Sequence, residues 1–172
     1  MSNRLELTEA FVNSVLAAAE LAPASFVVPV AFGVRVGVTL DPRQVRLAGD
    51  TIVVPLQPGR GPRIRVELRF MSFADGMAWW RVGEVSLGGV PVPVAGLLHE
   101  ALRRWLGHPD LVMHEGGRLG IAINRYLAVR RVPMAIRHLE LHHGLRVELD
   151  AAPPAADEFR SGDARADGTS RT

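Results

Sequence analysis

Apolar residues recur at helical spacing in two stretches of the chain. Between Thr8 and Leu21 they fall on one side of a helix, and Thr8 is a suitable N-cap. A second apolar stripe runs from Val94 to Leu106, and Gly107 follows it as a stop signal. The pattern therefore predicts two amphipathic helices, one near the N-terminus and one in the middle of the chain.

Most of the remaining chain alternates apolar and polar residues with a period of two. The alternation predicts about eight antiparallel strands, each apolar on one face. In the clearest strand the even-numbered residues from Ile64 to Phe70 face inward, and we expect them to pack on the second helix. Strands are expected within the ranges 34–40, 45–47, 52–56, 63–70, 77–87, 111–113, 119–123, 136–141 and 145–149.

Composition agrees with one folded α+β domain followed by a tail. The chain has 172 residues, of which 48% are hydrophobic and 22% are charged, as in ordinary globular proteins. We assign residues 1–150 to a single domain. Residues 151–172 contain Phe159 as their only large apolar side chain. Such a segment buries too little surface to offset its ordering entropy, so we expect a disordered tail.

The basic residues are all arginine, and the chain contains no cysteine. Disulfides, thiolate metal sites, cysteine nucleophiles and a phosphate-loop lysine are thereby excluded. The segment Met1–Glu6 lacks the shape of a signal peptide, and no apolar run approaches the ~20 residues that span a bilayer. We expect a cytoplasmic protein from the sequence as written, or an envelope-associated one if the start site is misassigned.

Two groups of histidines deserve comparison with metal sites. His99-Glu100 begins a zinc-binding HExxH pattern, but Arg103 replaces the second histidine. His138, Glu140 and His142 share one face of a predicted strand, and two imidazoles with a carboxylate can bind a divalent metal. The alternating residues Leu139 and Leu141 take the core face. Solvent exposure of the two histidines and the glutamate is therefore the simpler interpretation. We expect no metal, no cofactor and no catalytic residues, with a histidine-dependent metalloenzyme as the least favoured alternative.

Arginines and aromatic residues form two further clusters along the chain. Arg63, Arg65 and Arg69 follow one strand face, with Arg35 and Arg81 as further members; this row is a solvated sheet face or a strip that binds phosphates. Nucleic acid is disfavoured because aromatic residues make up only 6%. The second cluster is either core with one exposed ring or the mouth of an apolar ligand site. It consists of Phe70, Met71, Phe73, Met77, Trp79 and Trp80.

Two segments resemble the tubular lipid-binding (TULIP) superfamily, in particular its small YpmS-like and LmeA-like bacterial members. Leu7–Leu16 is similar to the opening helix of these proteins, and Val85–Pro93 is similar to their strand and proline-containing connector before the second helix. The hairpins around Leu119–Ile123 and Leu139–Leu149 follow in the expected order. The resemblance covers roughly residues 5–150.

This resemblance implies a strongly curved antiparallel sheet wrapped around amphipathic helices, with a groove for acyl chains. We expect non-catalytic binding of a lipid or another long apolar ligand in a groove between helix and sheet, together with peripheral membrane contact. The arginines Arg63, Arg65 and Arg69 are expected to bind a headgroup. The groove is expected to be bordered by Phe70, Phe73, Met77, Trp80, Leu98 and Trp105. The alternative is a protein-interaction or structural domain whose core is fully packed.

Overall fold

The structure is a computed structural model that describes residues 3–29, 33–87 and 89–151. Its helices are α1 (Glu9–Ala18), α2 (Val94–Leu106) and α3 (Ile123–Val129), with short 3-10 turns η2 (Pro42–Gln44) and η3 (Pro109–Leu111). The strands are β1 (Asn3–Thr8), β2 (Ala24–Pro29), β3 (Arg35–Leu40), β4 (Arg46–Ala48), β5 (Thr51–Pro58), β6 (Ile64–Ala74), β7 (Met77–Val82), β8 (Val85–Leu87), β9 (Val90–Val92), β10 (Val112–Glu115), β11 (Arg118–Ala122), β12 (Met134–Leu141) and β13 (Gly144–Ala151).

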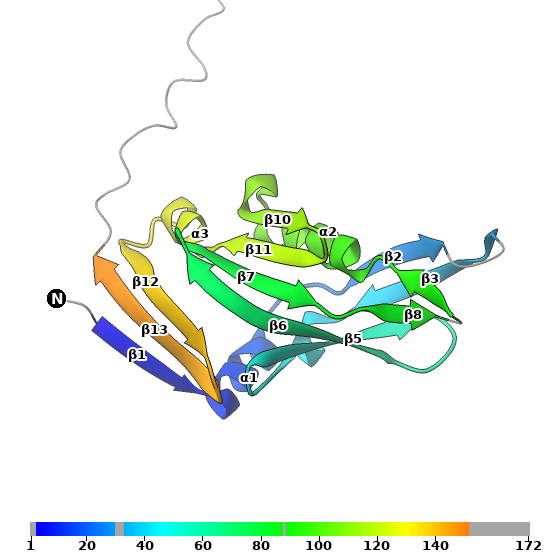
Figure 1. The fold of residues 1–172 in the computed structure, drawn as a ribbon, viewed down its shortest axis with the longest axis horizontal. Coiled ribbons are helices and arrows are strands. Elements are labelled where there is room, and N and C mark those ends of the chain that lie inside the picture. The colour runs from blue at the N-terminus through cyan, green and yellow to red at the C-terminus, as the bar shows by residue number, and fades with distance from the viewer. Residues whose placement is uncertain (1–2, 30–32, 88, 152–172) are drawn as a thin grey trace, which may run out of the picture.

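The described strands form two main antiparallel sheets and a small hairpin. An eight-stranded sheet has the order β10-β11-β7-β6-β5-β3-β2, with β4 also paired to β5. A separate three-stranded sheet has the order β1-β13-β12, and β8 pairs with β9. Figure 1 shows the large sheet as a strongly curved half-barrel, with the three-stranded sheet across one end of it. The predicted α+β class with a strongly curved antiparallel sheet is therefore confirmed.

One contiguous core lies between the large sheet and α2. Val66 and Leu68 of β6 are buried in the same cluster as Leu98 and Ala101 of α2. The helix runs beside β10, β11 and η3 and ends at Gly107, whose left-handed conformation closes the last turn. The predicted bounds of this helix match the structure. The inward face predicted for the strand after residue 63 is also confirmed.

The N-terminal helix is held in a different way. None of the ten described residues of α1 is buried, and Phe11 and Val15 are each 54% exposed. Polar contacts fasten the helix instead. The Asn13 side chain donates to the carbonyl of Leu47 at 3.0 Å and accepts from the Leu47 N–H at 2.6 Å, and Glu9 accepts from the Gly49 N–H at 3.0 Å.

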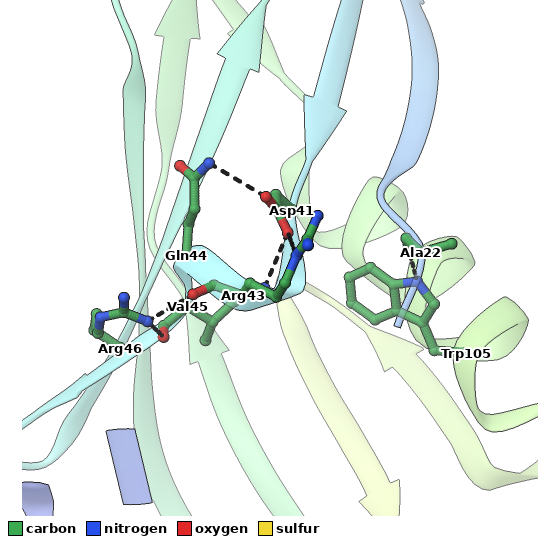
Figure 2. A network of polar contacts seen from close by, with 7 residues as sticks. All are labelled: Ala22, Asp41, Arg43, Gln44, Val45, Arg46 and Trp105. Atoms are coloured by element: carbon green, nitrogen blue, oxygen red, sulfur yellow. Dashed lines mark hydrogen bonds and ion pairs between the residues drawn. The ribbon is translucent and has the colours of Figure 1, made fainter. Parts of the chain in front are cut away.

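A polar network stabilises the turn on which α1 rests (Figure 2). Asp41 accepts from the backbone N–H of Arg43 at 3.1 Å and from the Gln44 side chain at 3.3 Å. Burial raises the pKa of the Asp41 carboxyl, but the hydrogen bonds and charge of Arg43, with Gln44, outweigh it and hold the pKa below its ordinary value. Arg46 donates to the carbonyls of Arg43 and Val45, both at 2.8 Å.

The structure differs from the sequence predictions in several elements. The strand expected over 77–87 is divided into β7 and β8, where Gly83 donates to the carbonyl of Glu67 at 2.7 Å. Strands β1, β2 and β9 lie outside the ranges predicted to be strands, and α1 ends at Ala18 instead of continuing to Leu21. Apart from Ala151, which ends β13, the tail predicted for residues 151–172 lies outside the described residues. Among the described residues, no helix combines the length and apolarity needed to cross a membrane.

Candidate functional site

An open cleft of about 680 Å3 lies where the three-stranded sheet meets the edge of the core. Strand β1, the β12–β13 hairpin and one side chain of β6 build its walls. Its size falls within the 300–1,000 Å3 range that is usual for small-molecule sites. The lining residues are Glu6, Leu7, Thr8, Phe70, Glu140, Leu141, His142, His143, Gly144, Leu145 and Arg146.

Strand register brings these distant segments together. Leu7 pairs with Leu145 and Thr8 with Gly144 across β1 and β13, and Leu145 also pairs with Leu141 of β12. The hairpin turns through His143, which adopts a left-handed conformation with φ of 52°. Histidine tolerates this region better than most residues do. The cleft therefore forms at the end of the sheet where the hairpin turns.

The apolar side of the cleft continues into the main core. Phe70 and Leu141 line the cleft and also pack against the core cluster. The Phe70 ring meets the Trp80 ring edge-on, with centroids 5.1 Å apart. Trp80 is only 7% exposed, and its buried indole N–H has no hydrogen-bond partner among the described residues. Phe70 therefore connects the wall of the cleft to the buried Trp80.

The polar side of the cleft carries a chain of charged groups. Arg146 lies 3.1 Å from Glu6 and 3.3 Å from Glu140, and His138 lies 3.0 Å from Glu140. The hydrogen bond from His138, followed by the charges of His138 and Arg146, lowers the pKa of the Glu140 carboxyl. The ring centroids of His142 and His143 lie 4.6 Å apart. The cleft is therefore amphipathic, with leucine and phenylalanine on one side and ionisable groups on the other.

The six residues predicted to border a groove lie around the core cluster. Trp80 and Leu98 are buried, at 7% and 4% exposed, and the other four are partly buried against the same cluster. Trp105 donates its indole N–H to the carbonyl of Ala22 at 3.0 Å (Figure 2). Phe70 is the member of this set that also lines the cleft described above. The full set is Phe70, Phe73, Met77, Trp80, Leu98 and Trp105.

The predicted headgroup arginines lie on the other face of β6. Arg65 and Arg69 are exposed and alternate with the buried Val66 and Leu68, so they point away from the core. Arg63 precedes the strand and donates to the side chain of Gln57 at 3.0 Å. Their binding of a headgroup stays a prediction, separate from the cleft.

Two further arginines extend this row across the sheet. Register places Arg69 opposite Arg81, and Arg81 opposite Arg118. The guanidinium of Arg118 lies 5.8 Å from the Trp79 ring centroid. This ring packs over Gly120 beside Met77. Trp79 and Met77 therefore share the outer face, in keeping with the expectation that only one of the two consecutive tryptophans points into the core.

The histidines do not gather into a larger cluster. Among the residues that the structure describes, no group of three or more His, Cys, Asp or Glu side chains is placed to hold a metal ion. His99 contacts the carbonyl of Val112 at 3.2 Å, and its ring lies 6.0 Å from that of His114. The absence of a metal and of catalysis stays a prediction.

Sequence reasoning missed most of the cleft. Leu141 and Leu145 were assigned only to strands, and Leu7 only to the segment that resembles an opening helix. The available signal was the turn at His143-Gly144 between two amphipathic strands, which predicts a hairpin but not what lies opposite it.

Comparison of the chain with family models, with curated proteins and with solved structures finds no match.

Proposed function

We propose that this protein is a non-catalytic binder of a lipid or another long apolar ligand with a polar end. The ligand occupies the cleft between the three-stranded sheet and β6, with its apolar part against Leu7, Phe70 and Leu145. The observation that carries the proposal is the continuity of this cleft with the apolar core through Phe70 and Leu141. A chain that enters the cleft is removed from water along its length, which is the main source of affinity for such ligands.

The polar side of the cleft fits the polar end of the ligand. His142 and His143 stand at the hairpin turn, and both are exposed. Imidazoles donate or accept hydrogen bonds according to tautomer, so they accommodate a carboxyl, hydroxyl or phosphate group. Arg146 is shared between two carboxylates, and its role here is to hold the strand ends together.

We also propose that the chain is TULIP-like. What supports this assignment is the curved antiparallel sheet with α2 packed against its buried face, together with the two sequence segments that resemble this superfamily. Peripheral contact with a membrane belongs to the same proposal, since a lipid carrier must collect its ligand there. The exposed apolar residues Phe11 and Val15 of α1 supply a surface for such contact.

A protein-interaction or structural domain without ligand remains the second candidate. The observation that favours it is the tight packing of α2, because Leu98 and Ala101 are buried against the sheet. On this account the cleft is a solvent-filled recess between two sheets. The two candidates differ in whether a long apolar molecule binds with defined stoichiometry.

Titration with a fluorescent long-chain fatty acid tests the proposal. Leu145→Trp adds a bulky ring inside the cleft, and we expect it to weaken saturable binding at least about tenfold, equivalent to about 1.4 kcal/mol. Leu149→Trp places the same ring on the same strand outside the cleft lining, and binding should stay close to the wild-type value. Thermal unfolding of both variants confirms that they are folded.

The possible results separate the candidates. Saturable one-to-one binding that only Leu145→Trp weakens supports the cleft as the site. Equal binding by both variants contradicts the cleft. If the wild-type protein shows no saturable binding, the interaction or structural domain is the better account.

A further inference from the structure

Strand β1 is an exposed edge of the three-stranded sheet. It pairs along its whole length with β13, from Asn3 opposite Leu149 to Thr8 opposite Gly144. On its other side it pairs with no strand of the described residues. Alternate backbone N–H and C=O groups of an edge strand point outward, and they form a template for another strand.

The other end strands of the two main sheets carry features that disfavour such pairing. Strand β2 contains Pro29, which cannot donate a ladder hydrogen bond, and β10 is only four residues long. Strand β12 has an irregular register between Ile136 and His138, and it lies against β6 and α3. These are the usual protections of natural edge strands.

Strand β1 lacks these protections. Its six residues, Asn-Arg-Leu-Glu-Leu-Thr, include no proline or glycine, and its register with β13 is regular. Leu5 at the centre is 44% exposed. A regular edge with an exposed leucine at its middle favours association with a further strand.

The charges of β1 identify the partner. If two copies pair in antiparallel fashion about Leu5, each Leu5 lies opposite the other, and Arg4 of each copy lies opposite Glu6 of its partner. Opposite charges at facing positions stabilise a strand pair, and like charges destabilise it. In the single chain Arg4 contacts Glu6 at 2.7 Å, and Glu6 also contacts Arg146 at 3.1 Å. All three side chains are exposed, so pairing between copies can replace the Arg4–Glu6 contact within each chain.

We infer that β1 pairs with β1 of a second copy of this chain around a twofold axis at Leu5. The pairing joins two three-stranded sheets into one six-stranded sheet that runs across the dimer. The interface is isologous, since each strand presents the same residues to the other. This inference does not depend on the proposed ligand.

The strand pair alone makes a small interface. Standard stable interfaces bury about 1,600 Å2 in total, and one edge of six residues supplies only part of that area. We therefore expect a weak dimer that depends on protein concentration.

Sedimentation velocity from low to several hundred micromolar protein tests for the dimer. The mass of the wild-type protein is expected to rise from that of a monomer towards that of a dimer. Leu5→Lys places two ammonium groups opposite each other at the axis and should leave a monomer. A wild-type protein that stays monomeric throughout, or a Leu5→Lys variant that still dimerises, overturns the inference.

A charge-reversal pair tests the register. Arg4→Glu makes both charged positions of β1 acidic, and Glu6→Arg makes both basic, so each variant alone places like charges opposite each other. Each should dimerise at least about tenfold more weakly than the wild type. Mixed together, the two variants should form a heterodimer of nearly wild-type affinity, because every facing pair is then opposite in charge.

Mixing also separates association from folding. Both variants disturb contacts within their own chain, since Glu6 also contacts Arg146 at 3.1 Å, and thermal unfolding measures that loss. Recovery of the dimer on mixing can arise only between chains. If mixing gives no heterodimer, or if each variant alone dimerises like the wild type, this pairing is wrong and the edge has another occupant.

Discussion

The two sheets of this protein are stabilised in different ways. The large sheet and α2 share a core in which Val66, Leu119 and Ala101 are fully inaccessible. The buried apolar residues of the three-stranded sheet are Leu139 and Val147, and both lie outside that core cluster. Helix α1 buries none of its described residues. Hydrogen bonds to asparagine side chains and strand pairing hold the smaller region in place.

The region that stabilises the fold therefore differs from the region that we assign to binding. The large sheet has the burial that sustains a cooperative fold, at roughly 25 cal/mol per Å2 of apolar surface. The smaller sheet carries the cleft, the exposed apolar residues of α1 and the free edge of β1. Binding regions are often drawn from the less stable parts of a protein, and the smaller sheet is the region that we assign to binding.

Truncating an apolar side chain in each region should give the largest contrast. Leu68→Ala in β6 leaves a cavity in the main core, and we expect it to lower the free energy of unfolding by about 2–5 kcal/mol. Leu5→Ala in β1 removes a side chain that is 44% exposed, so its cost should stay below about 1 kcal/mol. Chemical denaturation at low protein concentration measures both values. Similar losses of unfolding free energy in the two variants would contradict the difference between the two regions.

Two glycine substitutions should act in opposite directions. A Cβ at Gly144 would lie 2.5 Å from the carbonyl oxygen of Leu7, so Gly144→Ala must push β1 away from β13. We expect a loss of about 1–3 kcal/mol and weaker fatty-acid binding. A Cβ at Gly96 in α2 meets nothing within 4 Å, and Gly96→Ala should stabilise the helix by up to about 1 kcal/mol. Thermal unfolding compares them, and destabilisation by Gly96→Ala would show that α2 is more constrained than described.

Asn124 joins the two regions and offers a test of their coupling. Its side chain donates to the carbonyl of Ile136 at 2.8 Å and accepts from the Ile136 N–H at 2.7 Å, while its backbone N–H donates to Gly76 of the β6–β7 turn at 3.1 Å. Asn124→Ala should cost about 1–2 kcal/mol, because the two backbone groups of Ile136 lose their partner. Hydrogen exchange should show faster exchange in β12 and unchanged exchange in β5. A uniform increase would mean that the regions unfold together.

The smallest expected effect concerns the charged side of the cleft. The pKa of Glu140 lies below its ordinary value, chiefly through the hydrogen bond from His138. Its contribution to stability is therefore complete above the ordinary glutamate pKa and is lost as the pH falls through the lower folded-state pKa. His138→Ala removes this donor and should return the pKa towards its ordinary value in a carboxyl-detected NMR titration. Arg146→Gln should shift it less, and the reverse order would contradict the assigned cause.

The sequence predicts the elements with strong local periodicity and misses strands that depend on distant pairing, such as β1. Helix α2 and the strand face from Ile64 to Phe70 have strong local periodicity. The bounds of α2 and the inward faces of both elements agree with the structure, although β6 continues to Ala74. The segment Asn3–Thr8 is short and half polar, and it becomes a strand only by pairing with residues 144–149 at the far end of the described chain. Local patterns carry no information about such pairing.

The candidate site shows the same limitation. Phe70 was predicted because aromatic and methionine residues cluster around it, and that signal is local. The remaining walls of the cleft come from residues 6–8 and 140–146, which only the fold brings beside β6. Conversely, Trp80 and Leu98 were predicted to border the groove that the family resemblance implies, and the structure buries both in the core. Burial depends on packing across the sheet, which spacing along the chain does not reveal.

Hydrogen exchange with and without a saturating long-chain fatty acid tests most directly whether the small sheet is the binding region. The account predicts that added protection is concentrated in residues 5–8 and 140–146 and at the Phe70 end of β6. Exchange in β3, β5 and α2 should be unchanged, because these elements belong to the core that binding leaves intact. Protection that appears mainly in α2 and the core strands, or that appears nowhere, would contradict the account.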